Sequence, residues 1–241
     1  MKISRVNPLI EFIQSSTGTI HKILIQKDKK NPKLNQIITL ARKKSIPLHF
    51  VPKKNLDRWD KNHQGIVAFG AEKVLSSLED VLSSSKLPFF VLLDNIEDPQ
   101  NLGAIIRTAE GAGVDALIIP ERRTAGLTES VFRVSAGALS YIKVSIVKNL
   151  ANTMEELKKH GIWIVGAESE GEKNWYEFDY TIPLAIVLGS EGKGLRTLVK
   201  KKCDLILSIP LFGHINSLNV AAASSIFLFE VVRQRMNKKI E

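Results

Sequence analysis

"LLDNIEDPQNLGAIIRTAEGAG", residues 92–113, joins the end of a short apolar run to an amphipathic segment, and this junction decides the fold. Asp98 is placed to cap a helix and Pro99 to open it. Apolar side chains then recur at helical spacing, at Leu102, Ile105, Ile106 and Ala109. The stretch therefore predicts a strand, a loop and a helix in that order, which is the repeating unit of a parallel α/β sheet.

Six apolar, β-branched runs lie between residues 88 and 241, with helical stretches between them: FFVLLD, DALIIP, YIKVSIV, GIWIVGA, PLAIVLG and DLILSIP. Continuous apolar runs of this length are typical of strands that are buried on both faces. Residues 88–241 are therefore expected to form an α/β domain with a mostly parallel sheet covered by helices on both sides.

The first third of the chain has a different organisation. Short strand-like runs at residues 20–26, 47–51 and 65–70, with a helical stretch at 31–44, predict a small α/β unit over residues 1–75. The serine-rich segment at residues 76–87 is interpreted as a linker to the larger domain.

The net charge of +9 is confined to the first third of the chain. Residues 1–87 hold 16 Lys and Arg against 7 Asp and Glu, whereas residues 88–241 hold 18 of each. A solvated lysine-rich face is the simpler interpretation of such an excess. A whole segment at +9 beside a neutral one favours binding to a polyanion, since each neutralised phosphate releases counterions.

Several classes of function are disfavoured by what the sequence contains. Cys203 is the only cysteine, which excludes an internal disulfide, and no motif around it indicates a catalytic thiol. No two of the five histidines are spaced as a local metal pair, so no metal site is expected. The longest apolar run, at 89–93, is too short to span a bilayer, and an intracellular, cytoplasmic protein without membrane contact is expected.

Three stretches carry residues suited to chemistry. Arg107 lies about 150° around the predicted helix from its apolar stripe. It is either an ordinary surface arginine or an arginine at the edge of the sheet where open α/β folds bind ligands. In "AIVLGSEGKGL", residues 185–195, glycines permit a ligand to approach the backbone, and Glu191 adds a carboxylate. Its glycine spacing fits neither a dinucleotide fingerprint nor a phosphate-binding P-loop, which disfavours a dehydrogenase or an NTPase.

The third stretch is "IPLFGHINSLNVAAASSIFLF", residues 209–229. A strand ends there, a loop follows, and a helix is predicted to begin near Ser217, so that Ser217 and Asn219 lie at its N-terminus. Ser217 is either the cap of that helix or part of a site. The small residues that follow allow another backbone segment to pack very closely.

Taken in order, "DNIEDPQNLGAIIRTAEGAG", "IVLGSEGKGL" and "IPLFGHINSLNVAAASSIFLFEVVRQR" resemble the three motifs of the SpoU/TrmH family of RNA ribose 2'-O-methyltransferases, within the SPOUT class. Their order and spacing match over residues 88–235. "KNHQGIVA", residues 61–68, resembles the end of the extra N-terminal domain that some members carry. The resemblance therefore covers nearly the whole chain.

The resemblance implies a C-terminal trefoil knot, which is rare among proteins, and a homodimer. It also implies that residues 1–75 read RNA as a ribosomal-protein-like domain and that residues 88–241 are the methyltransferase. S-adenosylmethionine is the implied cofactor, bound at Ala167, Gly189, Gly192, Ile209 and Leu218. The implied catalytic residues are Asn101, Arg107, Glu191, Ser217 and Asn219.

The resemblance further implies that the methyl group goes to the ribose 2'-hydroxyl of a guanosine in 23S rRNA. Arg107 is expected to act as an electrostatic clamp, positioned partly by Glu191, because a guanidinium holds its proton above about pH 12. Two alternatives remain: methylation of another rRNA site or of tRNA, and an RNA-binding or ribosome-assembly protein without catalytic activity.

Overall fold

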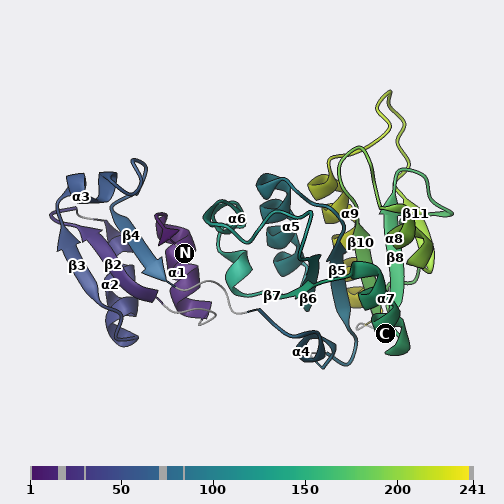
Figure 1. Cartoon of the computed structure of the whole chain (residues 1–241), viewed down its shortest axis with the longest axis horizontal. Coiled ribbons are helices and arrows are strands. Elements are labelled where there is room, and N and C mark those ends of the chain that lie inside the picture. Colours follow the sequence, from purple (N-terminus) through teal and green to yellow (C-terminus); the bar gives the residue numbers. More distant parts are fainter. Residues whose placement is uncertain (1, 16–19, 30, 71–74, 84, 239–241) are drawn as a thin grey trace. The chain divides into compact units, whose positions relative to one another are not determined.

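The computed structural model describes residues 2–15, 20–29, 31–70, 75–83 and 85–238 (Figure 1). By their contacts the residues fall into two compact units. Unit 1 consists of Met1–Val74 together with Leu127–Tyr141, and unit 2 consists of Leu75–Gly126 together with Ile142–Glu241. The functional boundaries expected at residues 75 and 88 stay predictions.

Unit 1 is built on a four-stranded sheet with the order β1-β4-β2-β3. Strand β4 is antiparallel to β1 and to β2, and β2 is parallel to β3. The elements are β1 (Lys2–Ile3), α1 (Val6–Ser15), β2 (Ile20–Gln26), α2 (Pro32–Lys43), β3 (Leu48–Val51), α3 (Lys53–Asp57), β4 (Ile66–Gly70), α6 (Glu129–Val134) and the 3-10 turn η1 (Ala138–Ser140). The three strands and the helix predicted between residues 20 and 70 are confirmed to within one residue at each end.

Residues 127–141 join unit 1 although they lie between two strands of unit 2 in the sequence. Phe132 of α6 packs edge-on against Phe12 of α1, with ring centroids 5.5 Å apart. Gly137 begins η1 with φ at 95°, and a Cβ there would lie 2.6 Å from the Cβ of Glu11. Only glycine therefore fits this close approach to α1.

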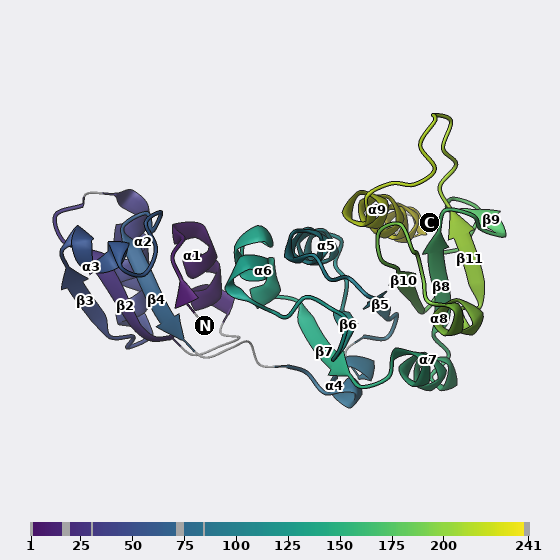
Figure 2. The same ribbon diagram turned by 45° about the horizontal axis from the view of Figure 1, so that its top comes forward.

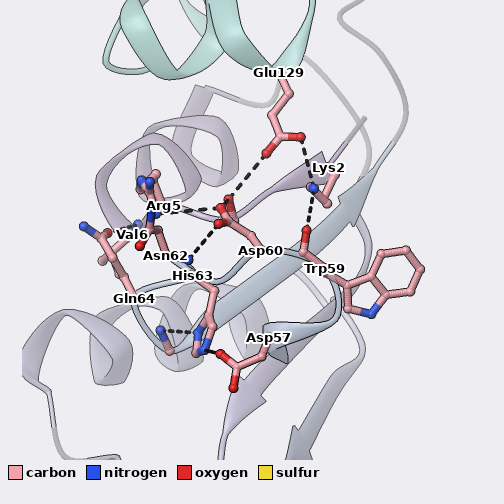
Figure 3. Close-up of polar contacts among 12 residues, drawn as sticks. Lys2, Arg5, Val6, Asp57, Trp59, Asp60, Asn62, His63, Gln64 and Glu129 are labelled. Carbon is pink, nitrogen blue, oxygen red and sulfur yellow. Dashed lines mark hydrogen bonds and ion pairs between the residues drawn. The ribbon is translucent and has the colours of Figure 1, made fainter. Parts of the chain in front are cut away.

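A cluster of charged and polar side chains also connects this segment to the first strand (Figure 3). Lys2 forms an ion pair of 3.5 Å with Glu129 and donates to the carbonyl of Trp59 at 2.9 Å. Asp60 accepts hydrogen bonds from Ser4 and from the backbone N–H of Asn62. Burial alone would raise the pKa of Asp60, but these hydrogen bonds and the nearby charges of Arg5 and Lys2 lower it overall.

Unit 2 is built on a seven-stranded sheet with the order β7-β6-β5-β10-β8-β11-β9, and every neighbouring pair in it is parallel. The strands are β5 (Phe89–Leu93), β6 (Ala116–Pro120), β7 (Lys143–Val147), β8 (Trp163–Glu168), β9 (Lys173–Asn174), β10 (Leu184–Leu188) and β11 (Leu205–Ser208). The six predicted strands and the parallel α/β class are confirmed. The short edge strand β9 was not predicted, because two polar residues give no periodic signal.

Helices cover both faces of this sheet (Figure 2). They are α4 (Leu78–Leu82), α5 (Pro99–Gly111), α7 (Leu150–Lys159), α8 (Thr197–Lys202) and α9 (Val220–Lys238). Helices α5 and α9 pack together on one face, where the hydroxyls of Thr108 and Ser225 lie 3.4 Å apart. On the other face α4, α7 and α8 share one buried apolar cluster with the strands.

The segment interpreted as a linker, residues 76–87, contains α4. Ser77 caps this helix through a reciprocal pair of hydrogen bonds with Asp80. Val81 is fully buried in the core of unit 2. Residue 84 of the same segment lies outside the described residues. Among the helices of the described residues, none is long and apolar enough to cross a membrane.

Candidate active site

The strand order of unit 2 places its functional loops at one edge of the sheet. From β5 the chain runs outward to β6 and β7, while the later strands lie on the other side of β5, beginning with β10. The order thus reverses between β5 and β10. Open α/β sheets bind ligands at the carboxyl ends of the strands beside such a reversal. The loops after β5, β10 and β11 carry the three stretches that the sequence singled out.

Three of the predicted catalytic side chains meet at this edge and bond to one another. The Asn219 amide nitrogen donates to Asn101 Oδ1 at 3.0 Å and also to Glu191 Oε1. The Asn101 amide nitrogen donates to Glu191 Oε2 at 3.1 Å. We call this arrangement of Asn101, Glu191 and Asn219 the polar triad. Its members come from positions 28 to 118 residues apart.

Helix α9 fixes the orientation of the triad. Asn219 Oδ1 accepts hydrogen bonds from the backbone N–H groups of Ala221 and Ala222, at 2.9 and 3.3 Å. Because its oxygen is held by the helix N-terminus, its nitrogen must face Asn101 and Glu191. Asn219 is therefore the cap of α9, and the alternative that Ser217 caps this helix is wrong.

The glycine-rich loop after β10 is closed on itself and held at both ends. Ser190 and Gly194 exchange backbone hydrogen bonds of 3.1 and 3.0 Å. A Cβ on Gly189 would lie 2.3 Å from the carbonyl carbon of Gly194, so the two strands of the turn touch through their backbones. Glu168, at the end of β8, accepts the N–H of Leu195 at 2.5 Å. These contacts fix the backbone of the loop, which presents its backbone and the Glu191 side chain to the site.

A buried aspartate holds the other end of this loop. Asp94 follows β5 directly and is completely buried. Its two oxygens accept the backbone N–H of Arg196 at 2.8 Å and the Arg196 Nε at 2.6 Å. Sequence reasoning missed Glu168, Asp94 and Arg196. The position of Asp94 and Glu168 at strand ends was the available signal for a role in the site. Nothing local in the sequence, however, identifies the partner of Asp94, which is 102 residues away.

A cavity opens between the glycine loop, the end of β8 and the start of α9. Its lining includes all five predicted cofactor residues, Ala167, Gly189, Gly192, Ile209 and Leu218, together with Glu191 and Ser217. Leu188, Leu211, Val220 and Phe227 add apolar walls. Apolar walls with backbone groups and a few polar side chains suit a cofactor that has a flat base at one end and polar groups at the other.

Arg107 lies apart from the polar triad. It is exposed on α5, whereas Leu102, Ile105, Ile106 and Ala109 are buried, which confirms the predicted faces of this helix. The Glu191 carboxylate bonds to Asn101 and Asn219 in this structure, and the expectation that it also positions Arg107 stays a prediction. Arg107 comes six positions after Asn101, a rise of about 9 Å along α5.

Cys203 does not have the environment of a nucleophile. Burial raises the pKa of its thiol to about 12. Its Sγ faces the carbonyl of Val199 at 3.5 Å. A thiol with this pKa stays protonated near neutral pH and does not act as a nucleophile.

Fold and site together define an α/β protein that binds a ligand at the switch point of a parallel sheet and carries a separate basic unit. Comparison with protein families identifies residues 88–229 as a SpoU rRNA methylase domain. Residues 6–73 match the substrate-binding domain of RNA 2'-O ribose methyltransferases. The chain therefore belongs to the SpoU/TrmH family of RNA methyltransferases.

Relatives and solved structures agree with this assignment. A TrmH family tRNA/rRNA methyltransferase of Staphylococcus saprophyticus is 45% identical over 91% of this chain and 90% of its own. Another TrmH family tRNA/rRNA methyltransferase, from Bacillus subtilis, is 40% identical, and the alignment covers 95% of this chain and 94% of the relative's length.

Among solved structures, the SpoU methyltransferase AviRb from Streptomyces viridochromogenes, crystallised with AdoMet, aligns with a TM-score of 0.85. It is 24% identical and covers 98% of this chain and 91% of its own. The A. aeolicus TrmH/SpoU tRNA modifying enzyme aligns with a TM-score of 0.58 at 32% identity, over 67% of this chain and 82% of its own.

Proposed function

We propose that the protein transfers the methyl group of S-adenosylmethionine to the ribose 2'-hydroxyl of a guanosine in 23S rRNA. The observation that carries this proposal is the polar triad of Asn101, Glu191 and Asn219, held beside a cavity whose lining includes all five predicted cofactor residues. The bound cofactor supplies an electrophilic methyl group on a sulfonium. A ribose hydroxyl is a weak nucleophile, so this chain must place it and stabilise the charge that develops on its oxygen.

The protein side chains have separate tasks in this reaction. Glu191 accepts hydrogen bonds from two amides, which fix its position at the mouth of the cavity. In the proposed arrangement Ser217, on the cavity wall, contacts the cofactor or the ribose. Arg107 stabilises negative charge on the ribose oxygen and the neighbouring phosphate, since a guanidinium is a donor that keeps its proton. When bound, S-adenosylmethionine would supply the methyl group and leave as its neutral thioether, and the hydroxyl proton would pass to solvent.

The basic surface of unit 1 supports an RNA substrate. Two adjoining cavities of this unit share Arg5, Lys29 and Gln64 in their linings. The other cations that line them are Lys33, Lys53, Lys61 and Arg133. None of the described residues that line either cavity is acidic. A cationic surface of this kind binds the phosphate backbone through counterion release.

The reaction is tested by transfer of labelled methyl from S-adenosylmethionine to unmodified 23S rRNA, with the product mapped as a block to alkaline cleavage. One 2'-O-methyl guanosine in that rRNA is the expected result. Transfer to tRNA, or to another rRNA nucleotide, would contradict the proposed target nucleotide but support the proposed reaction. Cofactor binding without transfer to any RNA would contradict the reaction and favour a non-catalytic RNA-binding role.

We expect the Lys53→Gln/Lys61→Gln variant to bind RNA more weakly than the wild-type protein. Each lost phosphate contact lowers the slope of log Kd against log salt concentration by about 0.7 to 0.9, so the slope of the double variant should be lower by about 1.4 to 1.8. Filter binding across a salt series measures this slope. The control is Arg42→Gln/Lys43→Gln, which removes the same charge from the exposed last turn of α2. An equal loss in both variants would mean that net charge, rather than these cavities, determines the affinity.

From the family resemblance we also propose the trefoil knot, the homodimer and the cytoplasmic location. Light scattering of the purified protein tests the dimer directly. A monomeric mass at working concentration would contradict it.

A further inference from the structure

Unit 2 has a basic cavity of its own, outside the polar triad. It lies where β6 and β7 end and where α7 and α8 begin. Its lining is Pro120, Arg122, Arg123, Lys148, Asn149, Leu150, Ala151, Arg196, Leu198 and Val199. Four of these residues are cationic, and no acidic residue is among those that line it. We call it the β6/β7 cavity.

Strand pairing explains why these cations gather. Pro120 and Val147, the last residues of β6 and β7, are register partners, and the N–H of Glu121 donates to the Val147 carbonyl at 2.9 Å. The residues that follow both strands therefore leave the sheet side by side. Arg123 has φ at 60°, a left-handed conformation that is unfavourable for a non-glycine residue. The chain therefore turns sharply at the second of two successive arginines.

Arg196 is held rigidly in this cavity. Its Nε and its backbone N–H both donate to Asp94, which is fully buried, while the Arg196 side chain is 39% exposed. The terminal nitrogens of the guanidinium take no part in these two bonds. Asp94 offsets most of the Arg196 charge, so the uncompensated positive charge of the cavity comes from Arg122, Arg123 and Lys148.

The β6/β7 cavity lies in line with the active site. Along the carboxyl edge, the ends of β7 and β6 come first, then those of β5 and β10, then those of β8 and β11. A second cavity at the ends of β5 and β10 is lined by Asn101, Glu191 and Lys193 among others. The end of β6 is next to the end of β5 in the sheet, about 4.8 Å away, although the cavity is lined from the face that carries α7 and α8 and the triad from the face that carries α5 and α9. Arg196 also links the two, because it follows the glycine loop directly.

We propose that the β6/β7 cavity binds backbone phosphate of the RNA strand next to the target nucleotide. This inference rests on the proposed function and adds a contact made by the catalytic unit itself. Residues 88–241 have no net charge, yet the charged residues that line this cavity are all cations, so the neutrality of the segment as a whole does not extend to this cavity. Arginine in particular offers paired donors that match a phosphate.

The test is the Arg122→Gln/Lys148→Gln variant of the full-length protein. Both side chains are exposed, and the variant leaves the Asp94 and Arg196 contacts in place. We expect its affinity for a 23S rRNA fragment to fall about 10- to 100-fold at low salt, with the salt slope reduced by about 1.4. Its affinity for S-adenosylmethionine, measured by calorimetry, should not change.

The matched control is Lys86→Gln/Lys201→Gln, which removes the same charge from two exposed positions of unit 2. It should change the slope little. Equal RNA binding by the cavity variant and the wild-type protein would overturn the proposal, and so would an equal loss in the control. RNA binding is measured here without methyl transfer. If the wild-type protein bound RNA but transferred no methyl group, the proposed function would be contradicted, whereas the test of this cavity would still be valid.

Discussion

We expect the Arg107→Ala variant to bind S-adenosylmethionine as tightly as the wild-type protein and to transfer methyl groups about 100 to 1,000 times more slowly. The loss should fall on the transfer rate because the guanidinium stabilises charge that develops only in the transition state. Arg107 is exposed on α5 and lines none of the cofactor cavity. Its removal therefore should not disturb cofactor binding or the fold. Single-turnover transfer and calorimetry measure the two quantities separately.

Two further variants define what Arg107 contributes. Arg107→Lys keeps the charge but loses the paired donors of the guanidinium, and it should recover only part of the rate. Glu110→Ala changes another exposed side chain of the same helix and should transfer at the wild-type rate. A normal rate for Arg107→Ala would remove this residue from the proposed mechanism. A loss of cofactor affinity equal to the loss of rate would instead place it in the cofactor site.

Much of unit 2 could be predicted because its signals are local. Continuous apolar runs identify strands that are buried on both faces, and Asp98 with Pro99 marks the start of α5. The three stretches at the carboxyl edge also follow from parallel pairing, which brings successive strand ends to one side. The family resemblance, rather than a local pattern, named Asn101, Glu191 and Asn219, and the structure brings these three side chains together.

The contacts that were missed are those that no local pattern encodes. Asp94 and Arg196 look like ordinary residues at a strand end and a helix start until the fold brings them together. Residues 127–141 join unit 1 through Phe132 and Glu129, which on their own fit equally well in either unit. Ser217 was considered as the cap of α9 and Asn219 was not, since both residue types cap helices well and only the helix start at Val220 separates them.

Substitution of Gly189, in the glycine-rich loop, is expected to have the second large effect on the protein, here on cofactor affinity. We expect Gly189→Ala to lower the affinity for S-adenosylmethionine about 10- to 100-fold. A Cβ there would lie 2.3 Å from the carbonyl carbon of Gly194 and 2.5 Å from the backbone nitrogen of Leu195. Backbone atoms cannot move aside as a flexible side chain can. Forcing an extra carbon into packed structure costs about 1 to 3 kcal/mol, and each 1.4 kcal/mol lost from binding is about tenfold in affinity.

Gly192→Ala is the matched control, because a Cβ at this position would meet no atom within 4 Å. Its φ of 76° makes alanine unfavourable by about 1 to 2 kcal/mol, but the loop keeps its closed backbone contact. Calorimetry should therefore rank the affinities as wild type, then Gly192→Ala, then Gly189→Ala, with thermal unfolding confirming that all three are folded. If Gly189→Ala bound the cofactor as well as Gly192→Ala, the closed turn would not be what shapes the cavity. Side chains such as Glu168 and Leu218 would then have to determine the affinity.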